Sequence, residues 1–78
     1  MSADLVVYLA RQLVDEPDAV EVEALERDGA LVLQLRVAPD DVGKVIGRGG
    51  RIIRALRTVV RASAARADRR ILLEVVDG

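Results

Sequence analysis

The chain has 78 residues, 51% of them hydrophobic, with no Cys, no His and one aromatic side chain, Tyr8. This length supports one small domain with an aliphatic core, and the missing residue types exclude disulfide bonds, thiolate chemistry and imidazole catalysis. No apolar run approaches the roughly 18–20 residues that cross a bilayer, so we expect a cytoplasmic protein with no membrane segment.

The net charge of −1 conceals a sharp division of charge along the chain. Residues 1–41 contain ten acidic and three basic side chains, whereas residues 42–70 contain nine basic side chains and one acidic side chain. This division predicts one cationic face, which an anionic partner could use, beside an acidic remainder.

The N-terminal segment has the apolar spacing of an amphipathic helix. Leucines recur at every fourth position, which predicts a helix over residues 3–15 whose core-facing residues are Leu5, Leu9 and Leu13. Pro17 cannot continue this helix because it has no backbone N–H to donate. A turn should therefore follow.

A β-hairpin is predicted next. Apolar residues alternate with glutamates over residues 19–25, which is typical of a strand with one solvent-facing side. Asp28-Gly29 suits a two-residue hairpin turn, and residues 30–37 then predict a second strand. The second strand should be more buried than the first, because its two sides are both largely apolar.

The second half of the chain predicts two helices and a third strand. Asp40 and Asp41 precede a short helix that should end near Ile46, and we interpret these carboxylates as helix caps. Good helix formers predict a long helix over residues 51–66. Residues 71–76 are rich in β-branched and aliphatic side chains and predict a short strand.

The predicted order of elements is αββααβ, within a single domain over residues 1–78. The last strand follows two helices, so it should return parallel to its predecessor by a right-handed crossover. We therefore expect an α+β fold in which a three-stranded mixed sheet carries three helices packed on one face.

The tetrad Gly47-Arg48-Gly49-Gly50 separates the two predicted helices. Glycine permits positive φ and close approach to the backbone, and the next helix start offers free N–H groups and a positive dipole end, so phosphates could bind here. A plain joint between helices is the alternative. A Walker A motif would need a Lys-Ser/Thr pair, and a dinucleotide motif would need glycine where Ile52 stands.

The long predicted helix carries a stripe of arginines. At about 100° per residue, four of them share one side, opposite the apolar face: Arg51, Arg54, Arg57 and Arg61. A solvated helix surface is one explanation. No acidic residue stands between Asp41 and Asp68 to form helical ion pairs, however, and this absence favours an anionic ligand.

The segment VIGRGGRII at residues 45–53 resembles the signature of the KH domain, whose GxxG loop clamps the backbone of about four nucleotides. The order αββααβ resembles the type II, bacterial form, and the whole chain is similar to small single-KH proteins of the KhpA (YlqC) family. The resemblance implies a non-catalytic protein that binds single-stranded RNA, without a cofactor, metal or small-molecule substrate. It also implies self-association, pairing with a KhpB (Jag) type of protein, and action as an RNA chaperone in post-transcriptional regulation.

The resemblance assigns RNA contacts to the loop and its flanks. The residues concerned are Lys44, Gly47, Arg48, Gly49, Gly50, Arg51 and Arg54. The two helices beside the loop and the last strand would form the walls of a groove for bases. The apolar residues that could floor it are Val45, Ile46, Ile52 and Ile53, each of which could equally belong to the core. Many family members carry a polar residue where Gly49 stands, so this loop should be more mobile. Without aromatic stacking platforms, binding should be weak and low in sequence specificity.

A second hypothesis is a protein-interaction or dimerisation scaffold with little RNA binding of its own. A scaffold could lose a loop glycine or place an acidic residue beside the loop, whereas this chain keeps both terminal glycines among basic residues. No residue suggests catalysis, because the hydroxyl side chains have no histidine to activate them. We therefore predict a binding protein and not an enzyme.

Overall fold

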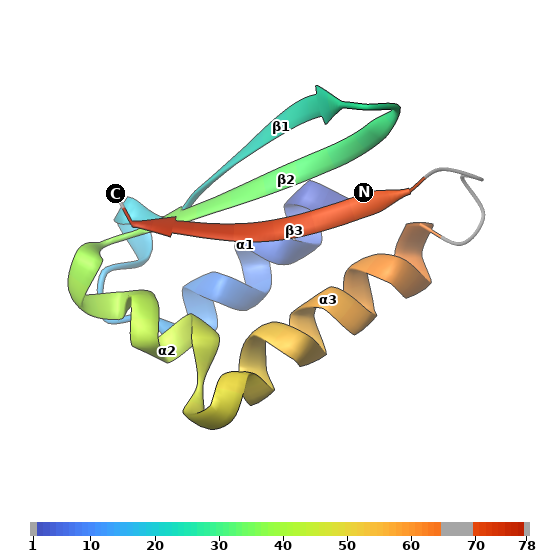
Figure 1. Cartoon of the computed structure of the whole chain (residues 1–78). Helices are drawn as coiled ribbons and strands as arrows, with labels where there is room; N and C mark the ends of the chain where they lie inside the picture. Colours follow the sequence, from blue (N-terminus) through green and yellow to red (C-terminus); the bar gives the residue numbers. More distant parts are fainter. Residues whose placement is uncertain (1, 65–69, 78) are drawn as a thin grey trace.

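The computed structural model describes residues 2–64 and 70–77, which form a three-stranded sheet with its helices on one face (Figure 1). The regular elements in chain order are α1 (Ser2–Leu13), β1 (Glu21–Arg27), β2 (Ala30–Val37), α2 (Val42–Ile46), α3 (Arg51–Ala64) and β3 (Ile71–Asp77). Three single 3-10 turns complete them: η1 (Pro17–Ala19), η2 (Pro39–Asp41) and η3 (Arg48–Gly50). This architecture confirms the predicted fold class.

The sheet is mixed, with the strand order β1-β2-β3. β1 pairs antiparallel with β2, whereas β3 pairs parallel with β2 through neighbours such as Leu33 and Leu73. The parallel return is possible because α2 and α3 connect opposite ends of the two strands. β2 is central and has no exposed residue, while β1 exposes most of its residues, as the sequence predicted.

The hairpin confirms the predicted turn and corrects the first strand. Asp28 and Gly29 have φ values of 53° and 81°, the paired positive values of a type I′ turn. This tight turn lets pairing extend to the last rung, Arg27 with Ala30. The strand runs over Glu21–Arg27, so it begins and ends two residues later than the predicted range of 19–25, and Ala19 belongs to η1.

Helix α1 packs with a different face from the one its leucines predicted. Val6 and Ala10 are fully buried, whereas Leu5, Leu9 and Leu13 are only half-buried. Helix α1 packs against the sheet and against α3 at the same time. The buried face of α1 therefore lies between the side turned to the sheet and the side that carries the three leucines. The helix also ends at Leu13 and not at residue 15.

The core lies between the sheet and the three helices. Its buried residues come from α1, β2, α2, α3 and β3, and from Val20 before β1: Val6, Ala10, Val20, Leu33, Leu35, Val37, Val45, Ile53, Leu56, Val60 and Leu73. The predicted long helix extends from Arg51 through Ala64, and its last two expected positions lie outside the described residues. Within the described ranges, none of the helices has the length and apolar character needed to span a membrane.

Candidate nucleic-acid interface

Gly47 begins the loop between α2 and α3, and its position requires glycine for two reasons. Its φ of 77° and ψ of 169° lie in a region that is essentially closed to other residues. A Cβ built there would lie 2.6 Å from Ile52 Cγ1 and 2.9 Å from the backbone nitrogen of Ile52. The loop therefore begins pressed against the first turn of α3.

The tip of the loop is open. Gly49 has φ 63° and ψ 18°, a left-handed conformation, and a Cβ built there would meet nothing within 4 Å. Gly50 also has a positive φ, 75°. Two successive residues therefore have positive φ before α3 begins. This conformation leaves the backbone at the tip of the loop accessible.

The polar backbone groups of the loop divide into carbonyls that accept hydrogen bonds and N–H groups that lack an acceptor among the described residues. The carbonyl of Gly47 accepts from the N–H of Gly50 at 3.1 Å, and the carbonyl of Arg48 accepts from the first N–H of α3. The carbonyl of Gly49 accepts from Nη2 of Arg54 at 2.8 Å. The N–H groups of Arg48 and Gly49 have no acceptor within the described part of the chain. The loop thus offers free donors while its carbonyls are occupied, which suits an anion.

Two arginine side chains flank these donors. Arg48 lies in the loop and Arg51 is the first residue of α3, and both are exposed. Neither forms an ion pair with an acidic side chain among the described residues. They therefore add two unpaired positive charges beside the free N–H groups and the positive end of the α3 dipole.

Lys44 is in a different situation from these arginines. Its Nζ lies 3.2 Å from Oδ2 of Asp15 and 3.3 Å from Oδ1 of Asp41. The hydrogen bond to Asp15, followed by that to Asp41, raises the pKa of Lys44. The pair with Asp15 spans 29 positions and was not predicted, whereas Asp41 stands only three residues before Lys44.

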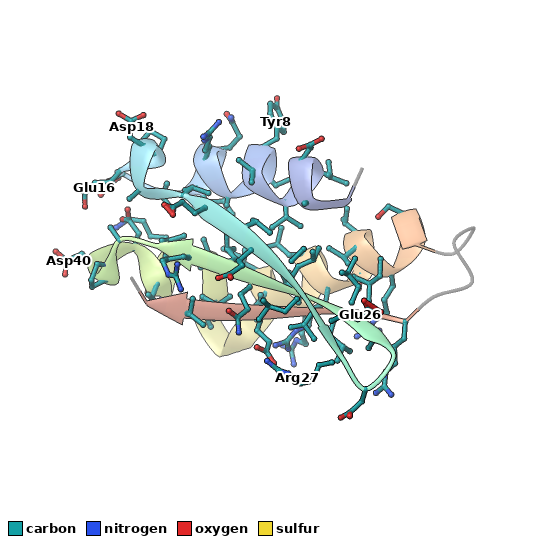
Figure 2. The ribbon with its side chains drawn as sticks, turned by 90° about the horizontal axis from the view of Figure 1, so that it is seen from above. Tyr8, Glu16, Asp18, Glu26, Arg27 and Asp40 are labelled. Atoms are coloured by element: carbon teal, nitrogen blue, oxygen red, sulfur yellow. The ribbon has the colours of Figure 1, made fainter. Side chains whose placement is uncertain are left out.

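Asp41 organises this junction and does not cap α2. Its side chain is 2% exposed and accepts the backbone N–H of Glu16 at 3.1 Å, with no capping bond to its own helix. Burial acts to raise the pKa of Asp41, but the hydrogen bonds from Glu16, Asp15 and Lys44 together lower it. The interpretation of Asp41 as a helix cap was therefore wrong. Asp40 is exposed, and Figure 2 shows it near Glu16 at one end of the molecule.

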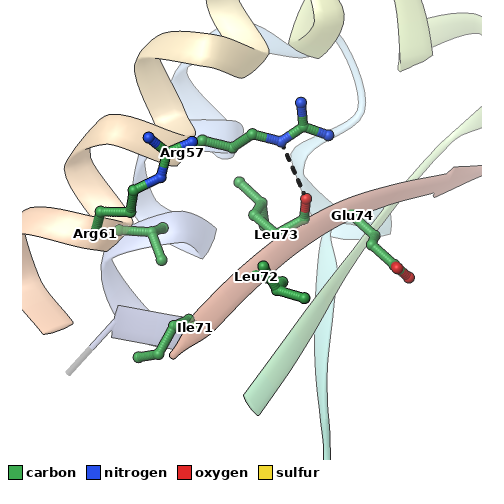
Figure 3. Close-up of a pocket in the computed structure, with 7 residues that line it drawn as sticks. Arg57, Arg61, Ile71, Leu72, Leu73 and Glu74 are labelled. Carbon is green, nitrogen blue, oxygen red and sulfur yellow. Dashed lines mark hydrogen bonds between the residues drawn. The ribbon is translucent and has the colours of Figure 1, made fainter. Parts of the chain in front are cut away.

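A groove of about 360 Å³ runs between α3 and the open edge of β3. Its lining residues are Arg57, Val60, Arg61, Ile71, Leu72, Leu73 and Glu74. Figure 3 shows the Arg57 side chain reaching across to β3, where its Nε donates to the carbonyl of Leu73 at 3.2 Å. β3 pairs with β2 along one edge, and among the described residues no strand pairs with its other edge, which borders this groove.

The predicted groove residues occupy other places. Val45 and Ile53 are buried in the core, while Ile46 and Ile52 are half-buried. None of the four lines the groove between α3 and β3. The last strand was predicted to wall such a groove, but its lining residues Ile71, Leu72, Leu73 and Glu74 were not predicted individually.

A second groove, of about 400 Å³, lies between α1 and α3. Its lining residues are Leu9, Gln12, Leu13, Arg51, Ile52, Ala55, Leu56 and Val59. The lining is almost wholly apolar, and Val59 is 37% exposed. This α1–α3 groove lies on the side of α3 turned away from Arg57 and Arg61.

The αββααβ order, with a GxxG loop joining α2 to α3, defines a type II KH domain. A family model described as KhpA/KhpB, KH domain matches residues 3–75. The chain belongs to this family, as the resemblance of its sequence predicted.

Relatives of nearly the same length support this membership. The chain is 52% identical over 77 residues to RNA-binding protein KhpA of Treponema pallidum, covering 99% of this chain and 96% of the relative. It is 45% identical over 73 residues to RNA-binding protein KhpA of Caldanaerobacter subterraneus, covering 94% and 97%. The relatives are named as RNA-binding proteins, which agrees with the prediction that this chain is not an enzyme.

Solved structures show the same fold within a larger protein. Era of Aquifex aeolicus, crystallised with GDP.AlF4-, superposes with a TM-score of 0.69 at 19% identity. Era in complex with MgGDPNP and nucleotides of 16S ribosomal RNA gives a TM-score of 0.67 at 22% identity. In both cases 97% of this chain is covered, but only 29% of the Era chain.

Proposed function

We propose that the chain is a single, non-catalytic KH domain that binds single-stranded RNA. The observation that carries this proposal is the loop over residues 47–50, where the carbonyls are occupied and two N–H groups are free. The relatives named as RNA-binding proteins add support, since they match this chain over nearly its full length.

In this proposal the loop binds the sugar-phosphate backbone. The free N–H groups of Arg48 and Gly49 donate to phosphate oxygens, and the side chains of Arg48 and Arg51 supply charge. Gly47 and Gly50 hold the loop in shape. Lys44 contributes least among the predicted residues, because Asp15 and Asp41 already neutralise it.

The bases would then lie in the groove between α3 and β3. Ile71, Leu72 and Leu73 give it an apolar wall, and Arg57 and Arg61 provide donors. The only aromatic residue, Tyr8, is on α1 and points away from the body of the protein (Figure 2). Without an aromatic stacking platform, we expect weak binding with little sequence preference.

We further propose that the protein acts in post-transcriptional regulation in the bacterial cytoplasm, as an RNA chaperone that forms a homodimer or pairs with a KhpB (Jag) type of protein. Pairing two KH domains would strengthen RNA binding through effective concentration. The α1–α3 groove favours this association, and it also supports the second candidate function, a dimerisation scaffold with little RNA binding of its own.

The test compares the wild type with the double variant Arg48→Asp/Gly49→Asp in binding to mixed-sequence single-stranded RNA over a salt series. Position 49 tolerates Asp because its conformation is left-handed and its surroundings are open. With two phosphates neutralised by Arg48 and Arg51, wild-type affinity should fall roughly sevenfold between 50 and 200 mM salt, and the variant should bind poorly.

The control is Arg11→Asp, which changes the charge of an exposed residue on α1 outside both the loop and the α3–β3 groove. It should retain most of the wild-type affinity, and circular dichroism should show all three proteins folded. Equal binding by the wild type and the loop variant, or no binding by either at low salt, would overturn the RNA site and favour the scaffold.

A further inference from the structure

Arg54 does something that the sequence did not predict. It stands five residues after Gly49 on the exposed side of α3, where a phosphate contact was expected. Instead, its Nη2 turns back to the loop and donates to the carbonyl of Gly49 at 2.8 Å. Such a bond from a guanidinium group is charge-assisted and stronger than a bond between neutral groups.

The Gly49 carbonyl is the one acceptor of the loop that the backbone leaves unoccupied. The carbonyls of Gly47 and Arg48 are both taken by backbone N–H groups of the same turn. Without Arg54, the Gly49 oxygen would carry its partial negative charge beside the free donors. That charge would oppose the approach of a phosphate.

The peptide between Gly49 and Gly50 is also unusually free to rotate. ψ of Gly49 is 18° and φ of Gly50 is 75°. A half-turn of this peptide plane would rotate each of these two angles by half a turn. Because both residues are glycine, both orientations are sterically open. In the turned orientation, the N–H of Gly50 would lose its bond to Gly47 and the loop would no longer present its donors in the same way.

We infer that Arg54 is a positioning residue, which fixes the Gly49–Gly50 peptide with its carbonyl occupied so that the loop is prepared for an anion. This inference rests on the proposed function of the loop. It assigns Arg54 an indirect role in RNA binding, in contrast to Arg48 and Arg51, whose side chains have no partner of this kind among the described residues. It also accounts for how a loop with three glycines is held in one shape.

The first arm of the test uses the free protein. Amide hydrogen exchange and ¹⁵N relaxation of Gly50 are compared between the wild type, Arg54→Gln and the charge-matched control Arg11→Gln. Loss of one ordering bond should speed exchange of the Gly50 amide by about tenfold in Arg54→Gln and leave it unchanged in the control. Unchanged exchange and relaxation in Arg54→Gln would overturn the assignment.

The second arm measures affinity for mixed-sequence single-stranded RNA over a salt series. The Arg54→Gln variant would have to order one or two backbone angles when it binds RNA, so its affinity should be roughly 5- to 30-fold weaker than that of the wild type. The salt dependence should stay at the wild-type slope, because no phosphate contact is lost. A slope reduced by about 0.7 would instead identify Arg54 as a direct phosphate contact and overturn the inference.

A rescue variant separates positioning from a general loss of structure. Asn at position 49 is compatible with φ 63° and ψ 18° but disfavours the turned orientation, whose ψ is open essentially to glycine alone. The double variant Arg54→Gln/Gly49→Asn should therefore recover most of the lost affinity. No recovery would contradict positioning. Failure of the wild type to bind RNA would overturn the proposed function, and the exchange measurement would still decide the role of Arg54 in the loop.

Discussion

Helix α2 and the loop that follows it place basic side chains in opposite situations. Within α2, Lys44 is neutralised by Asp15 and by the buried Asp41, so its charge joins α2 to the segment after α1. After α2, Arg48 and Arg51 are exposed and unpaired within the described residues, beside free backbone donors. Residues that look equivalent in the sequence therefore divide into a structural cation and two cations available to a ligand.

Gly43 within α2 and Gly47 directly after it give the largest expected difference in protein stability. Gly47→Ala should destabilise the protein by about 3 kcal/mol, because it combines backbone strain with a forced contact against α3. Gly43→Ala, within the same helix, meets nothing within 4 Å and should be neutral or stabilise by up to about 1 kcal/mol. Urea denaturation of both variants measures these changes. Equal stability of the two variants would refute the strained conformation of Gly47.

Asp41→Asn should lower the melting temperature by several degrees at neutral pH, because the junction loses its charged acceptor. The pKa of Asp41 in the folded protein lies below its ordinary value of 3.8, so its stabilising effect is present above that value and is lost as the pH falls through the folded pKa. The difference in melting temperature between wild type and variant should thus shrink from pH 7 toward pH 2. A constant difference across this range would contradict the role of the ionised carboxylate.

Replacing Lys44 within α2 or Arg48 after it separates the effect of a cation on stability from its effect on RNA binding. Lys44→Gln should lower the melting temperature and leave the salt slope of RNA binding unchanged, because its charge is already neutralised. Arg48→Gln should change stability by less than about 0.5 kcal/mol and reduce the slope by about 0.7. Thermal denaturation and RNA titrations on the same two variants measure both quantities. If Lys44→Gln also reduced the slope, the distinction between Lys44 as a structural cation and Arg48 as an RNA-binding cation would be wrong.

The sequence predicted the class of fold because its signals are local. The Asp28-Gly29 turn, the alternation in β2 and the long apolar face of α3 each depend on near neighbours, and the structure confirms them. The GxxG loop was also recognisable, since glycine is needed where φ is positive. These signals fix which elements form, and the short connections limit how they pack.

Two contacts at the junction of Lys44 and Asp41 are long-range, and the sequence could not predict them. Lys44 pairs with Asp15 across 29 positions, and Asp41 accepts the N–H of Glu16 across 25. Arg54 was expected to contact a phosphate, but its guanidinium group donates to the Gly49 carbonyl. Helical periodicity gives the direction of a side chain and not its partner.

The smallest expected effect compares two glycines within the loop itself. Gly49→Asn should change the free energy of unfolding by less than about 0.5 kcal/mol, because Asn tolerates the left-handed conformation and no atom lies within 4 Å of the added Cβ. Gly47→Ala, two residues earlier, should cost several times more. RNA affinity of Gly49→Asn should stay within about threefold of the wild type, since the N–H at position 49 is retained. A large loss of stability in Gly49→Asn would mean that the loop tip is packed and not open, and the free donors assigned to it would then be unavailable to RNA.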